Sequence, residues 1–320
     1  MVLIFNLMVQ GVQMMLVVAL APLLVGVTRK VRARLLRHKG APLIQPYRDL
    51  LRLMRKEVVL AENASWLFRT IPYLVFAATW VAAALVPTFA TGLHFSWTAD
   101  LIAIVALLGS ARFFLALAGM DVGTSFGGIG SSREMMIASL AEPAMMLTVF
   151  SLALIAGSTQ LSTVSAFMAS PVVGLRVSLG MALVALVIVA LAENARIPVD
   201  NPNTHLELTM VHEAMVLEYS GRHLAMIELA GALNLLLYVS LIGCIFVPWG
   251  IANRATGENA ADYLLAIVLY LAKLGAAGAL LAVFEVSIAK MRVFRVPDFL
   301  GIALMLALLG TLLLFVTRSL

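Results

Sequence analysis

The chain has 320 residues, of which 62% are hydrophobic and only 12% are charged, with a mean hydropathy of +1.02. A soluble domain carries about 25% charged residues, so this composition excludes an ordinary water-soluble fold. The single cysteine, Cys244, excludes a disulfide framework, and it also excludes a structural zinc site or an iron–sulfur cluster held by cysteines.

Eight stretches of the chain meet the requirement for a membrane-spanning helix, which is about 20 mostly apolar residues. No strand pattern, fixed repeat or low-complexity tract accompanies them. We therefore expect an all-α fold, an integral membrane bundle of about eight transmembrane helices, as a single domain over residues 1–320. The first stretch lacks a basic leader and a cleavage site, so we interpret it as a retained helix. The stretches are residues 3–27, 70–90, 99–119, 134–157, 172–192, 223–247, 261–287 and 299–317.

The Lys and Arg residues are distributed unevenly between the two sides that these helices define. By the positive-inside rule the basic side is cytoplasmic, which places both termini on the outer, periplasmic side of a cell inner membrane. The basic pI of about 9.6 then reflects this orientation and an attraction to anionic membrane lipids more than binding to nucleic acid. The basic connections are residues 28–69, 120–133, 193–222 and 288–298, whereas the other side holds only Arg176, Arg254 and Arg318.

The first basic connection also contains the pattern of an amphipathic helix. Such a helix lies in the plane of the membrane interface. The pattern fits an anchor, and it equally fits a gate beside a lateral opening in the bundle. Its apolar positions are Leu43, Ile44, Tyr47, Leu50, Leu51 and Met54, and its charged positions are Arg48, Asp49, Arg52, Arg55 and Lys56.

Ionisable residues gather in the cytoplasmic connections and in the helix halves beside them. Carboxylates in such a place are candidates for proton relay, because burial and neighbouring arginines can poise them near neutrality. The alternative is a set of buried Glu–Arg pairs that only fixes helix packing. We predict a charged, water-filled cavity that opens from the cytoplasm and ends at mid-membrane. The predicted path comprises Glu142, Glu228 and Glu285, an entrance of Glu193, Glu207, Glu213 and Glu218, Lys273 as a link towards a lateral partner, and Arg112 as an internal cation.

Two motifs that resemble known sites do not match them. His212-Glu213 begins like a zinc-protease motif, but Val216 stands where the second histidine belongs. His205 and His212 suggest no third ligand, so no metal site is expected. The glycine-rich residues 127–130 follow no strand and do not match the dinucleotide fingerprint. We expect these glycines to form an irregular loop that lines the cavity.

Longer motifs are specific enough to indicate a family. They stand at residues 29–34, 40–42, 45–49, 119–134, 193–200, 205–208 and 218–221. Through them nearly the whole chain resembles the complex I subunit 1 family, whose members anchor the peripheral arm and form the quinone chamber. It is most similar to the group 4 nickel–iron hydrogenase branch of that family, which includes formate hydrogenlyase subunit 4 and hydrogenase-4 component C.

The chain departs from the complex I pattern at specific residues. Complex I usually has Glu-Thr-Asn-Arg-x-Pro-Phe-Asp, whereas here Ala195 precedes Arg196 and Val199 replaces the phenylalanine. The Gly-Ser-Ser-Arg-Glu sequence at residues 130–134 is the hydrogenase-like form. These departures favour the hydrogenase branch, in which electrons pass to protons at a nickel–iron centre on a partner subunit, over a quinone site.

The resemblance implies a non-catalytic membrane anchor and coupling subunit of a respiratory-type oxidoreductase. Such a subunit docks the redox arm and links electron transfer to proton or sodium translocation. The implied partners are hydrogenase-type large and small subunits, an Fe–S subunit and antiporter-like membrane subunits, with the Fe–S clusters and nickel–iron centre on those partners and no cofactor on this chain. The residues expected to dock the arm or line the cavity loops are Asp121, Arg133, Glu134, Arg196, Asp200, Tyr219 and Arg222.

Two other functions remain open. One is the quinone-binding subunit of a complex I-type NADH:quinone oxidoreductase. The other is a stand-alone secondary transporter, a class that typically shows inverted repeats and broken helices around a midplane site. Neither a repeat nor a symmetric pair of interrupted helices is evident in this sequence.

Overall fold

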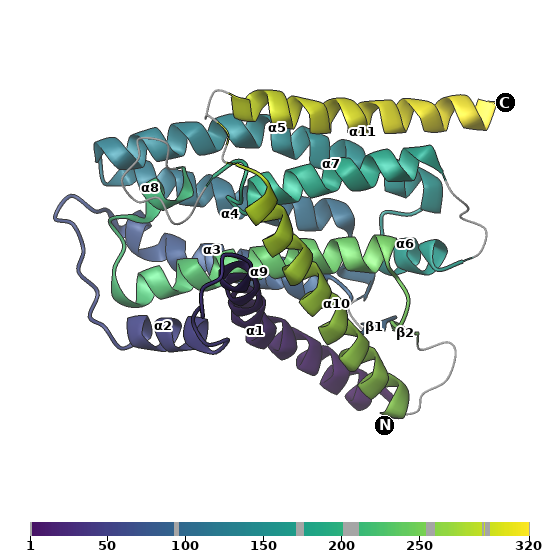
Figure 1. Ribbon diagram of the computed structural model, residues 1–320, viewed down its shortest axis with the longest axis horizontal. Helices are drawn as coiled ribbons and strands as arrows, with labels where there is room; N and C mark the ends of the chain where they lie inside the picture. Colours follow the sequence, from purple (N-terminus) through teal and green to yellow (C-terminus); the bar gives the residue numbers. More distant parts are fainter. Residues whose placement is uncertain are drawn as a thin grey trace.

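The computed structural model is a bundle of α-helices (Figure 1), and it confirms the predicted all-α fold. It describes residues 2–92, 96–170, 176–200, 211–253, 260–289, 291 and 295–319. The helices are α1 (Val2–Leu35), α2 (Gln45–Met54), α3 (Trp66–Leu85), α4 (Leu101–Asp121), α5 (Ser125–Ala156), α6 (Leu161–Met168), α7 (Val177–Glu193), α8 (His212–Val216), α9 (Gly221–Phe246), α10 (Ala260–Ser287) and α11 (Val296–Ser319). A 3₁₀ turn covers Ser96–Thr98, and the short strands β1 (Ala90–Thr91) and β2 (Ala252–Asn253) pair in parallel.

Every predicted membrane stretch coincides with a helix. Among the described residues, seven helices are long and apolar enough to cross a membrane: α1, α3, α4, α5, α9, α10 and α11. Helix α7 is also apolar but has only 17 residues, which corresponds to a rise of about 26 Å against a hydrocarbon core of roughly 30 Å. The predicted stretch 172–192 begins outside the described residues. The chain is thus a multi-pass membrane protein.

The predicted loop at residues 120–133 is wrong, because α5 begins at Ser125 and only three residues separate it from α4. The glycines are helical, and they serve close packing. A Cβ atom at Gly127 would lie 2.1 Å from the carbonyl oxygen of Gly119 on α4, and one at Gly130 would lie 2.9 Å from that of Val211 beside α8. Side chains would therefore separate α5 from α4 and α8. The hydroxyl of Thr124 caps α5 by accepting from the Gly127 amide.

The helices form two groups that cross. Helices α1 and α10 pack against each other and run obliquely across the other long helices in Figure 1. In the second group α3 packs on α4 and α9, and α11 packs along α5 and α7. Helices α10 and α11 keep large apolar side chains exposed, including Leu264, Leu280 and Phe315. In a membrane protein such faces suit lipid or neighbouring subunits.

The predicted amphipathic helix is confirmed as α2, which packs on α9 and α1. The hydroxyl of Tyr47 donates to the backbone carbonyl of Ala19 in α1, and burial raises the pKa of Tyr47. Leu51 and Met54 remain exposed. One side of α2 is therefore attached to the bundle, while apolar side chains on it remain available to the membrane interface.

Candidate functional site

A buried arginine stands at the centre of the first ionic cluster. The side chain of Arg112, on α4, is 7% exposed and lies between carboxylates from two other helices. Its Nε is 3.1 Å from Glu134 Oε1, its Nη1 is 3.9 Å from Glu142 Oε1, and its Nη2 contacts Glu193 Oε2. We call these four residues the Arg112 cluster. Its formal composition is one cation and three carboxylates.

Helical spacing accounts for how these carboxylates meet. Glu134 and Glu142 are eight residues apart on α5, so they lie on the same face of that helix, two turns apart. Glu193 is the last residue of α7. On α4, Gly109 lies one turn before Arg112, and a Cβ atom at this glycine would approach Glu142 Oε1 to 3.3 Å. The glycine thus leaves room for a carboxylate beside α4.

Two cavities border the Arg112 cluster. The larger has a volume of about 70 Å³ and is lined by polar groups that include Arg112, Glu134, Glu193, His212 and Asn234. The smaller, of about 10 Å³, is lined by Arg112, Glu142, Glu193 and Tyr238 among others. A cavity needs about 10–15 Å³ and several polar partners to hold one water. The larger cavity therefore has the size and lining for a few water molecules.

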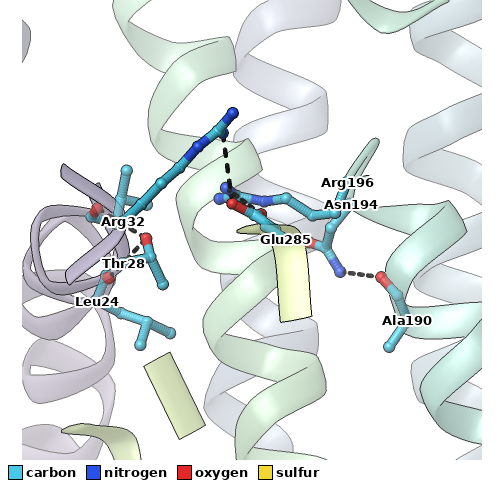
Figure 2. Close-up of polar contacts among 8 residues, drawn as sticks. Leu24, Thr28, Arg32, Ala190, Asn194, Arg196 and Glu285 are labelled. Atoms are coloured by element: carbon cyan, nitrogen blue, oxygen red, sulfur yellow. Dashed lines mark hydrogen bonds and ion pairs between the residues drawn. The ribbon is translucent and has the colours of Figure 1, made fainter. Parts of the chain in front are cut away.

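A second cluster has the opposite composition, with two arginines around one carboxylate. Glu285 of α10 has a side chain only 2% exposed, and it lies 3.5 Å from Arg32 Nη1 of α1 and 3.3 Å from Arg196 Nη1. Figure 2 shows Glu285 between the two guanidinium groups, which come from different parts of the chain. Burial lowers the pKa of Arg196, and the carboxylate of Glu285 acts against this by raising it. These three residues are called the Glu285 cluster.

The remaining predicted path residues lie apart from the two clusters. Glu228 is exposed on α9, the helix on which α2 packs, and Glu218 is exposed in the connection before α9. Glu213 is half-buried in α8, while Glu207 lies outside the described residues. The Nζ of Lys273 donates to the carbonyls of Val247, at 2.6 Å, and Trp249. Lys273 thus caps the C-terminal end of α9, as basic side chains commonly do.

Besides Glu134 and Arg196, which belong to the two clusters, the predicted docking residues Tyr219, Asp121 and Asp200 also make contacts inside the chain. Tyr219 is buried, stacks on Phe68 with ring centroids 3.9 Å apart, and donates to the Phe68 carbonyl. Burial also raises the pKa of Tyr219. Asp121 accepts from the Ser65 amide at 3.0 Å, and buried Asp200 accepts from the Val211 amide at 3.2 Å. These side chains hold connections between helices in place, whereas Arg222 is exposed.

Sequence reasoning missed Arg32 and Asn234. Arg32 counted only as part of a basic loop, but α1 continues to Leu35 and carries it to Glu285. Asn234 lies within the apolar helix α9, donates from Nδ2 to the Glu193 carbonyl at 3.2 Å and lines the larger cavity. An amide inside a membrane helix is itself a signal that could have found it.

No group of three or more His, Cys, Asp or Glu residues suited to a metal ion occurs among the residues that the structure describes. The ionisable residues of the two clusters are glutamate and arginine. Such groups can hold and exchange protons or fix helices together.

Comparisons with known proteins agree with this architecture. The family model of NADH dehydrogenase matches residues 7–316. Formate hydrogenlyase subunit 4 of Escherichia coli (strain K12) is 32% identical over 89% of this chain and 91% of that protein. Hydrogenase-4 component C of the same organism is 33% identical over 88% of this chain and 87% of that protein. A subunit of the NADH-quinone oxidoreductase of Bacteroides thetaiotaomicron is 27% identical over 72% of this chain and 65% of that protein.

The fold also has a counterpart among solved structures. A chain of the membrane-bound sulfane sulfur reductase, an archaeal respiratory membrane complex, superposes with a TM-score of 0.78. The superposition covers 95% of this chain and 99% of that chain. Since the two sequences are only 19% identical, this likeness concerns the fold alone.

Proposed function

This chain belongs to the NADH dehydrogenase family of complex I subunit 1-like membrane proteins, and we propose that it is the membrane anchor and coupling subunit of a nickel–iron hydrogenase or formate hydrogenlyase-like complex. Its similarity to formate hydrogenlyase subunit 4 and hydrogenase-4 component C supports that choice. On this proposal the Fe–S clusters and the nickel–iron centre lie on partner subunits. The chain itself docks the redox arm in the cytoplasm and couples electron transfer to proton or sodium movement.

The Arg112 cluster is the observation that carries the coupling role. Three carboxylates share one buried guanidinium beside a cavity of about 70 Å³. Negative charge in excess of the cation must be balanced by water or by bound protons, because an uncompensated buried charge is costly. A carboxylate that binds and releases a proton in response to events at the arm would couple the two processes.

Glu142 is the residue of the Arg112 cluster that can pass protons to a neighbouring subunit. Although it lies within a membrane helix, its side chain is 44% exposed in the isolated chain. A carboxylate at a lipid-facing surface needs a partner or water. We place an antiporter-like subunit against this part of α5, with Glu142 passing protons sideways to it. Glu193 contacts Arg112 from the end of α7. With Glu213 and Glu218, it supplies the cytoplasmic entrance.

Docking of the redox arm is assigned to the exposed charges on either side of Tyr219. Glu218 precedes buried Tyr219, and Arg222 follows it in the first turn of α9. The hydrogen bond and stacking of Tyr219 on Phe68 fix the position of this segment. Complementary charges set the register and choice of partner at such a surface. We expect R222E to release the soluble arm from purified membranes, measured as hydrogenase activity in the soluble fraction. R176Q, at the other end of the bundle, is the control, and full retention of the arm in R222E would contradict docking here.

A complex I-type quinone-binding subunit is the second candidate, because the similarity to an NADH-quinone oxidoreductase also extends over 72% of this chain. The two functions differ in their electron acceptor. If the hydrogenase proposal holds, the purified complex produces or consumes hydrogen with an artificial one-electron partner and no added quinone. Strict dependence on quinone, together with sensitivity to quinone-site inhibitors, would establish the second candidate instead.

A further inference from the structure

The last turns of α1 and the segment after it form an open basic groove that the proposed function does not use. It has a volume of about 710 Å³, and its lining consists of Lys30, Arg34, Arg37, His38, Lys39, Gly40 and Pro42. Among the residues that the structure describes, this lining contains no acidic side chain. Within the part of the chain that the structure describes, none of its lysines and arginines forms an ion pair with a carboxylate. We call this surface the basic groove.

Close backbone packing gives the basic groove a fixed shape. Gly40 has a φ of +66°, and a Cβ atom there would lie 2.6 Å from the Cβ of Ala33. Within α1, a Cβ atom at Gly26 would lie 2.4 Å from the carbonyl oxygen of Leu43. The amide of His38 donates to the Ala33 carbonyl at 2.8 Å. The loop therefore folds back onto α1 and holds the basic side chains around one space.

The length of α1 places the basic groove at the level of the lipid headgroups. Helix α1 has 34 residues and a length of about 51 Å, which exceeds the hydrocarbon core of roughly 30 Å. Its basic last turns therefore reach the headgroup layer, on the side that the positive-inside rule makes cytoplasmic. Leu35, Leu36, Leu43 and Ile44 are exposed beside the groove. These apolar side chains can contact acyl chains while the cations hold a phosphate.

From this juxtaposition we propose that the basic groove binds the phosphodiester headgroup of an anionic phospholipid from the cytoplasmic leaflet. Arg34 and Arg37 contact the phosphate oxygens, since guanidinium groups match phosphate in a two-point geometry. Lys30 and Lys39 add point charges. The bound lipid lies beside α1, which packs on both α2 and α10. The groove lining shares no residue with the Arg112 cluster and does not include Glu218 or Arg222.

The test measures phospholipid binding to the intact purified complex. Delipidated complex is titrated with phosphatidylglycerol in a phosphatidylcholine background, and bound lipid is counted by mass spectrometry. We expect K30Q/R34Q/R37Q to weaken binding of phosphatidylglycerol by at least about tenfold, because each basic residue near a membrane surface adds substantially to the attraction. The control R48Q/R55Q/K56Q removes the same charge from the α2 region outside the groove lining, and it should bind normally.

A second variant separates the shape of the groove from its charge. G40A keeps every basic residue but forces the loop away from Ala33, so it should also weaken binding. Equal losses in the groove variant and the α2 control would reduce the effect to diffuse charge and overturn the site. Unchanged lipid binding in K30Q/R34Q/R37Q would also overturn the site. The same holds if this variant loses a soluble subunit from the complex but still binds the lipid. Inorganic phosphate that binds as tightly as the lipid would overturn a phospholipid as the ligand, because the exposed Leu35, Leu36, Leu43 and Ile44 would then contribute nothing.

Discussion

The Arg112 cluster and the Glu285 cluster are both buried, but their charge ratios are opposite. In the first, one arginine faces Glu134, Glu142 and Glu193 beside a cavity. In the second, one carboxylate lies between Arg32 and Arg196 and joins α1, the segment after α7, and α10 (Figure 2). Both use the same two residue types, so composition alone does not distinguish their roles.

The difference lies in which group is in excess. A guanidinium stays protonated throughout the physiological range, so a cluster with excess arginine cannot exchange protons through them. Crowded carboxylates can share protons, because like charges at close range disfavour full ionisation. We therefore infer that the Glu285 cluster is a brace between helices and that the Arg112 cluster exchanges protons. Glu285 was grouped with the proton path on sequence alone, and its surroundings favour the brace.

Removing the carboxylate of the brace should have the largest effect on stability. The E285L variant leaves Arg32 and Arg196 without their shared partner, and breaking a buried ion pair costs about 3–5 kcal/mol. We expect a lower yield of assembled complex and a lower melting temperature in detergent. D49N, which removes the exposed Asp49–Arg52 pair, should change stability by less than about 1 kcal/mol.

A triple replacement sharpens the same comparison. The variant R32M/R196M/E285L exchanges the whole brace for apolar side chains, a change that is often neutral or stabilising for buried ion pairs. It should recover most of the stability that E285L loses. If the triple variant stays as unstable as E285L, or assembles well but loses coupling, Glu285 has a role beyond the brace.

Loss of Arg112 should also destabilise the protein, but in a way that depends on pH. The R112Q variant leaves three carboxylates close together, and protonation relieves their repulsion. A folded state that binds protons more strongly than the unfolded state gains stability as pH falls. The deficit of R112Q relative to the parent chain should therefore shrink between about pH 8 and pH 5. The deficit of E285L should stay constant there, because arginines keep their charge. Melting temperatures of R112Q and E285L, measured at both ends of this pH range, test this difference. Deficits that change with pH in the same way in both variants would contradict it.

The smallest expected effect on stability belongs to E142Q. Glu142 is 3.9 Å from Arg112 and 44% exposed, and pairs of this kind contribute about 0–1 kcal/mol. Glutamine keeps the shape and the hydrogen-bonding capacity of the side chain. The yield and melting temperature of the E142Q complex should match those of the parent within about 1 kcal/mol, and a loss comparable to that of E285L would assign Glu142 to packing.

The sequence predicted the helices well because hydropathy alone defines a membrane span. It failed at residues 120–133, where glycine was taken as a loop signal although Gly127 and Gly130 allow α5 to pack against α4 and α8. Glycine content cannot distinguish an irregular loop from a closely packed helix face, because both require the absence of a Cβ atom. Only the position of the neighbouring backbone decides between them.

The candidate site was predicted in part. The sequence indicated that Arg112, Glu142 and Glu193 matter, but it could not pair them, since the partners come from different helices. Glu134 was expected to dock the arm or to line the cavity loops; it lines the larger cavity and is 3.1 Å from Arg112. Lys273 was expected to face a lateral partner, but from α10 it caps the C-terminal end of α9. This contact depends on where α9 ends along α10. Helix crossing decides such contacts, and residue spacing within one helix does not.

The central claim is that the Arg112 cluster carries protons and the Glu285 cluster does not. The most direct measurement is proton transport by the whole complex in sealed vesicles, in which E142Q is compared with R32M/R196M/E285L at equal assembly. E142Q should lose most of the protons transported per turnover, because glutamine cannot bind and release a proton. The triple variant should transport protons normally. Normal transport in E142Q, with loss confined to the triple variant, would contradict the account.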